Sequence, residues 1–167
     1  MEFADAQPGF PVRVRQQSSN GQIAQQLADG ARAMAVWHDT EGKDTGVPAV
    51  VEAGAGLWVS HVLWADADVS QQQHFLLAAV GHYVPGTWER IVEGLLSGAA
   101  TAAEFESLEL LQKSVQGNVR AEPLAEKALA DAQQARAALA AGDYTRALTL
   151  ARGVGDLAQR AAAAAYP

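Results

Sequence analysis

The 167-residue chain contains no cysteine, few aromatic residues (7%) and fewer basic than acidic residues, 12 against 19. The absence of cysteine excludes disulfides, zinc-thiolate sites, iron–sulfur clusters and thiol nucleophiles. The shortage of Lys and Arg, which gives a formal net charge of -7, argues against nucleic-acid binding by counterion release. We therefore expect no nucleic-acid partner.

Long apolar runs are also missing. The longest candidate, Val47 to Trp64, is interrupted by Pro48, Glu52 and His61, whereas a membrane-spanning helix needs about 20 mostly apolar residues. The first residues carry acidic side chains where a signal peptide carries basic ones. These features predict a cytoplasmic protein without a membrane partner.

Alanine, by contrast, is abundant: the chain has 36 alanines, and 18 of them lie among the 47 residues from Ala121 onward. Alanine has the highest helix propensity, and apolar residues recur at helical spacing along most of the chain. The sequence therefore predicts an all-α fold, a single-domain bundle of about six to seven helices over residues 1–167. The predicted helices span 22–37, 47–64, 71–84, 88–96 and 105–115, with an Ala-rich helical hairpin at 122–165 and an irregular, extended arm at 1–17.

Possible chemistry is concentrated in the middle of the chain. All four His and all four Trp lie between residues 37 and 88, and residues 37–93 hold eight acidic and two basic side chains, a net charge of -6. A predicted helix would place His61 on one face with two tryptophans, at i-3 and i+3. The candidate ligand-binding residues are Trp58, His61, Trp64, His74 and His82. The same pattern is also typical of an aromatic core stripe, and both interpretations stay open.

A metal site is a narrower version of this hypothesis. His74 and His82 are two helical turns apart, too far for both to bind one ion from a straight helix. A site would need one of them to be joined by side chains from a neighbouring helix. The candidate metal ligands are therefore His61, His74, His82, Asp66 and Asp68, and a divalent metal ion is the alternative to the expectation of no cofactor.

Catalytic motifs are absent. The sequence has no His-Glu-x-x-His, no phosphate-binding loop and no dinucleotide-binding loop, and its serines lack the context of a nucleophile. We therefore name no catalytic residue and expect a non-enzymatic helical module that acts through protein–protein interaction or self-association, as a homodimer in the simplest case. The alternative is a helical bundle that binds a metal or small ligand within residues 37–93.

Overall fold

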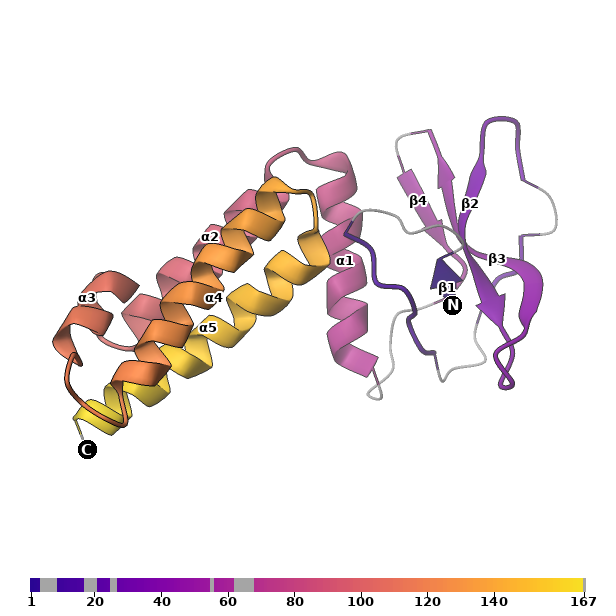
Figure 1. The fold of residues 1–167 in the computed structure, drawn as a ribbon. Coiled ribbons are helices and arrows are strands. Elements are labelled where there is room, and N and C mark those ends of the chain that lie inside the picture. Colours follow the sequence, from indigo (N-terminus) through magenta and orange to yellow (C-terminus); the bar gives the residue numbers. More distant parts are fainter. Residues whose placement is uncertain (4–8, 17–20, 25–26, 55, 62–67, 167) are drawn as a thin grey trace. The chain divides into compact units, whose positions relative to one another are not determined.

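The structure, a computed structural model, describes residues 1–3, 9–16, 21–24, 27–54, 56–61 and 68–166. The chain divides into two compact units, an N-terminal unit from Met1 to Pro85 and a C-terminal unit from Gly86 to Pro167. In the part of the chain that the structure describes, the N-terminal unit consists of four strands and one helix, and the C-terminal unit of four helices (Figure 1).

The N-terminal unit contains an antiparallel sheet, and its strands lie side by side in chain order. The strands are β1 (Glu2–Phe3), β2 (Arg32–His38), β3 (Asp44–Ala53) and β4 (Gly56–Val59). β-branched and aromatic side chains favour this extended backbone, as where Val51 of β3 pairs with Trp58 of β4. Gly42 and Gly54 follow β2 and β3 with φ values of 84° and 58°, which a residue with a side chain rarely adopts.

The core of the N-terminal unit contains a cluster of three aromatic rings. Phe75 of helix α1 (Val69–Tyr83) packs on Phe3 and Phe10, with both ring-centroid distances at 5.9 Å, and Phe3 lies 5.0 Å from Phe10. All three rings are at most 7% exposed. Because Phe75 is far from Phe3 and Phe10 in the sequence, this cluster forms only when α1 meets the N-terminal segment.

The C-terminal unit is entirely helical in its described residues. Its helices are α2 (Thr87–Ala102), α3 (Leu108–Ser114), α4 (Glu122–Ala140) and α5 (Tyr144–Ala165). Thirteen of the 19 residues in its buried apolar cluster are alanine, and such small side chains let helix axes approach closely. Between α4 and α5, Gly142 adopts a φ of 75°, and the Asp143 side chain accepts a hydrogen bond from the Arg146 backbone N–H (3.1 Å).

The prediction of an all-α helical bundle is wrong, because the described residues form five helices and a four-stranded sheet. The predicted helices at 22–37 and 47–64 overlap β2, β3 and β4 instead. Short apolar segments match helical and extended spacing almost equally well. Pro48, which the sequence places in a helical first turn, lies within β3, and Gly30, Gly42, Gly46 and Gly54 interrupt the region with positive φ angles.

Helices do occupy the other predicted segments, since α4 and α5 cover the range 122–165 and α1 to α3 overlap the three ranges before it. The predicted arm at 1–17 includes β1 and a paired segment around Arg13, while residues 4–8 and 17 lie outside the described part of the chain. Among the described residues, no helix combines the length and apolar character that crossing a membrane requires.

Candidate functional site

A pocket of about 520 Å³ lies in the N-terminal unit between the arm and the connection from β2 to β3. It is lined by Met1, by the arm residues Arg13, Val14, Arg15 and Gln16, and by residues 37–42. Pockets that bind small molecules commonly have volumes of about 300–1,000 Å³. This size makes the pocket a candidate binding site.

The arm side of the pocket is held by strand-like pairing with the first residues of the chain. The Met1 nitrogen donates to the Val14 carbonyl (2.8 Å), and the Val14 N–H donates to the Met1 carbonyl (2.9 Å). Val14 is fully buried, while its neighbours Arg13 and Arg15 are exposed. Successive side chains of an extended segment point to opposite sides, so Val14 lies in the core while Arg13 and Arg15 lie at the surface.

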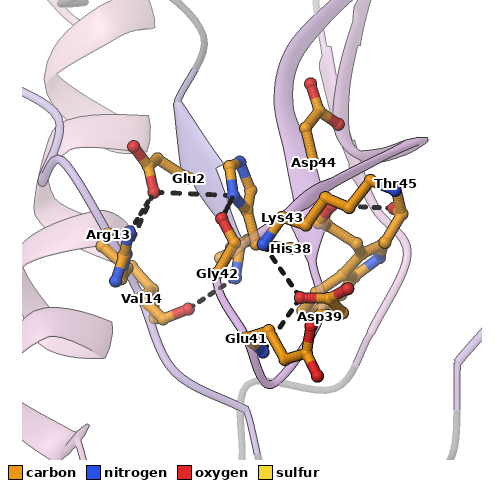
Figure 2. Close-up of polar contacts among 12 residues, drawn as sticks. Glu2, Arg13, Val14, His38, Asp39, Glu41, Gly42, Lys43, Asp44 and Thr45 are labelled. Carbon is orange, nitrogen blue, oxygen red and sulfur yellow. Dashed lines mark hydrogen bonds and ion pairs between the residues drawn. The ribbon is translucent and has the colours of Figure 1, made fainter.

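The opposite side is the connection between β2 and β3, and its own hydrogen bonds fix its shape (Figure 2). The Asp39 carboxylate accepts from the N–H groups of Glu41 (2.9 Å) and Lys43 (2.8 Å). The His38 Nδ1 atom lies 2.9 Å from the Gly42 carbonyl oxygen, which can only accept, so Nδ1 carries the proton. The Asp39 carboxylate therefore stabilises the turn, whereas the Glu41 carboxylate accepts no hydrogen bond from the described residues of the turn.

Glu2 links the two sides. Its Oε2 atom accepts from the Arg13 guanidinium, with Nε at 3.0 Å, and lies 3.9 Å from the His38 Nδ1 atom (Figure 2). The hydrogen bond from Arg13 holds the pKa of the Glu2 carboxyl below its ordinary value. Arg13 is thus already paired, whereas the side chains of Arg15 and Glu41 make no hydrogen bond or ion pair with any residue that the structure describes.

A second polar cluster connects the sheet to α1 through one carboxylate. The Glu52 Oε2 atom accepts from Arg32 Nη2 (2.8 Å), and the Glu52 Oε1 atom lies 2.6 Å from His82 Nε2. The hydrogen bond from Arg32, and after it that from His82, lowers the pKa of the Glu52 carboxyl. His82 serves here as a link between α1 and β3.

The other histidine and tryptophan candidates have different partners. His61 pairs with Gly21 in an isolated bridge and packs its ring edge-on to Trp37, with centroids 5.7 Å apart. Trp58 is half-buried in β4, and His74 is buried in α1. Trp64, a further ligand-binding candidate, lies outside the described residues.

The candidate carboxylate ligands are likewise dispersed. Asp68 accepts from the Arg15 backbone N–H (2.9 Å), and Asp66 lies outside the described residues. Within the described ranges, no group of three His, Asp or Glu side chains is arranged to hold a metal ion. The structure thus does not bring His61, His74, His82 and Asp68 together, and the metal site stays a prediction.

Helix α1 presents an apolar stripe on its exposed face. Val69, Leu76, Val80 and Tyr83 are 37–52% exposed, and with the exposed Gln73 they recur at steps of four, three, four and three residues. This is the spacing of the a and d positions in a coiled coil. The opposite face of the helix buries His74, Phe75 and Ala78. We call the five exposed residues the α1 seam.

Asp39 and Glu41 belong to the eight acidic residues within 37–93, but the sequence does not predict the pocket that they line. A signal was present, since the arginines alternate with apolar residues in the arm and Gly42 follows an acidic turn between β-branched segments. The sequence does not predict the α1 seam either, because apolar periodicity over 71–84 does not show which side of the helix is buried.

Comparison of the sequence with protein-family models, with curated proteins and with solved structures finds no match.

Proposed function

We propose that the chain is a non-enzymatic protein that self-associates through the α1 seam. The observation that carries this proposal is the exposed apolar repeat of α1, which has the period that a second helix matches. Contiguous exposed apolar surface on a folded protein is typical of an interaction site. The seam leaves the other face of α1 in place against Phe3 and Phe10, so docking a helix on it requires no change in the core.

The chemistry around the seam favours a second copy of this chain as the partner. In a coiled coil, charges at the positions beside the seam select the partner, and like charges oppose self-pairing. The positions of α1 and its C-cap that flank the seam are all uncharged: Ser70, Gln72, Leu77, Ala79 and Val84. Two copies of α1 therefore meet without repulsion between these positions, even though the whole chain is acidic.

The expected association is weak. A stable interface buries about 800 Å² on each partner. The seam spans only two heptads of one helix, so we expect it to bury a smaller area than this. We therefore expect a dissociation constant on the order of micromolar, with the interaction restricted to a symmetric pair. We further propose a cytoplasmic location, which cell fractionation and immunoblotting test.

Sedimentation equilibrium across micromolar to submillimolar protein tests self-association. We expect the average mass to rise from 17.5 kDa toward twice that value with concentration. Leu76→Glu places a charge in the middle of the seam and should keep the protein monomeric. Leu110→Glu is the matched control, because Leu110 in α3 is similarly exposed (46% against 52%). A monomeric wild type at every concentration, or equal loss of association in both variants, would contradict the proposal.

A further inference from the structure

We propose that the pocket between the arm and the β2–β3 connection binds a small zwitterionic ligand that carries an ammonium and a carboxylate, as free α-amino acids and short peptides do. The proposal is independent of self-association, because none of the pocket residues belongs to the α1 seam.

The side chain of Gln16 supplies the first observation. Gln16 lines the pocket, and its amide nitrogen and amide oxygen are both buried and have no hydrogen-bond partner among the residues that the structure describes. An amide donor and acceptor buried without partners are unfavourable, and most native structures avoid them. A ligand that offers both an acceptor and a donor, as a carboxylate with an ammonium or a peptide group does, satisfies both atoms once the side chain turns toward it.

The charges around the pocket supply the second observation. The arm contributes Arg15 and the β2–β3 connection contributes Glu41, and neither side chain has a partner among the described residues. The other charged groups of the lining have partners, because Arg13 binds Glu2, Asp39 accepts from its own turn and the Met1 ammonium donates to the Val14 carbonyl. One available cation and one available anion therefore come from opposite sides of the pocket.

These groups discriminate against ligands of a single charge. A simple anion would pair with Arg15, but its charge would lie beside the like charges of Glu41 and Asp39. A simple cation would pair with Glu41, but its charge would lie beside the like charge of Arg15. A zwitterion offers a carboxylate to the guanidinium and an ammonium to the carboxylate. Trp37, which is partly exposed, adds apolar surface to the lining, which suits a ligand with an apolar side chain.

The test is NMR titration of the full chain with four probes: L-leucine, its N-acetyl derivative, its amide and the dipeptide leucyl-leucine. We expect saturable shifts at the Trp37 indole and the Gln16 amide with leucine, with the dipeptide, or with both, and this result separates a free amino acid from a peptide as the source. N-acetylation removes the ammonium and amidation removes the carboxylate, so each should weaken binding at least tenfold.

Two variants test which charged group of the ligand each side chain binds. In Glu41→Gln the penalty for N-acetylation should shrink, whereas in Arg15→Gln the penalty for amidation should shrink. Absence of saturable shifts with leucine and with the dipeptide, or equal binding of the blocked and unblocked probes, would overturn the proposal. Leu76→Glu should bind as the wild type does, so failure of the dimer and failure of this site are distinguishable.

Gln16→Leu separates a binding role from a structural one. Removing an unpartnered amide should leave the denaturation midpoint of the ligand-free protein unchanged or raised, while ligand affinity falls at least tenfold. Gln133→Leu, at an exposed position of α4, is the matched control and should change neither quantity. If Gln16→Leu keeps full affinity, the amide does not contact the ligand and the proposal fails.

Discussion

The cores of the two units are built from different kinds of side chain. The N-terminal unit uses large side chains from distant segments, such as Phe3, Phe10 and Phe75, whereas the C-terminal unit packs alanines from successive helices. The N-terminal unit also holds all four histidines and three of the four tryptophans. The N-terminal unit therefore depends on contacts between distant segments, while the C-terminal unit gains its order from local helix formation and close packing.

Truncating an aromatic side chain should have the largest effect and should reveal which unit is affected. Phe75 is 1% exposed, and Phe75→Ala should destabilise the N-terminal unit by about 3–5 kcal/mol because it leaves a cavity. Denaturation followed by tryptophan fluorescence reports mainly on this unit, and far-UV circular dichroism mainly on the helices of the other. Leu111→Ala, in α3, is the counterpart, because Leu111 is fully buried in the apolar cluster of the C-terminal unit, and it should move the dichroism transition instead. If each substitution moves both signals equally, the two units unfold together and the contrast fails.

Enlarging a buried alanine side chain should lower the free energy of unfolding of the C-terminal unit. Ala132 of α4 is fully buried in the alanine-rich cluster, so Ala132→Leu should cost about 1–3 kcal/mol by forcing the helices apart. The same helix offers a control in Ala137→Leu, because Ala137 is exposed. Chemical denaturation followed by circular dichroism measures both. Tolerance of leucine at Ala132 would show that the alanine contacts are looser than the structure has them.

Low pH should slightly lower the free energy of unfolding of both units, through Glu52 in the N-terminal unit and Glu93 in the C-terminal unit. The hydrogen bond from Arg136 lowers the pKa of Glu93 in α2, as that from Arg32 lowers the pKa of Glu52. A carboxyl with a lowered folded-state pKa stabilises fully above its ordinary value of 4.5 and loses this contribution as pH falls through the lowered pKa. Because both pairs are partly exposed, each contribution should stay below about 1 kcal/mol.

Two variants separate these contributions by unit. Glu52→Gln should flatten the acid dependence of the fluorescence transition, and Glu93→Gln that of the dichroism transition. Denaturant midpoints measured from pH 3 to pH 7 make the comparison. An acid dependence that neither substitution alters would assign acid sensitivity to other carboxyl groups.

The sequence predicts the C-terminal unit better than the N-terminal one, for a physical reason. Helical hydrogen bonds join residues four apart, so the alanine content, Gly142 and Asp143 describe α4 and α5 locally. The strands depend on partners that the local sequence does not reveal, such as Ala35 beside Phe3 on one side and Val50 on the other. Propensity therefore misassigned 22–37 and 47–64.

The same reasoning explains what was missed at the candidate site. The concentration of His, Trp and acidic residues within 37–93 was visible, but the pocket joins residues of this region to Arg15 and Gln16 of the arm. That proximity arises from the pairing of Val14 with Met1 and of β1 with β2. Contacts between residues so far apart in sequence are not encoded in any short motif.

Site-specific cross-linking tests most directly the claim that the N-terminal unit mediates self-association. The chain has no cysteine, so a single introduced thiol reports on one position alone. Leu76 lies at the middle of the α1 seam, so it faces its own copy in a parallel pair and lies within one seam layer of it in an antiparallel pair centred on the seam. Under mild oxidation, Leu76→Cys should form a covalent dimer, and Leu110→Cys in α3 should remain monomeric. Equal cross-linking at both positions, or a dimer only through Leu110→Cys, would contradict the account.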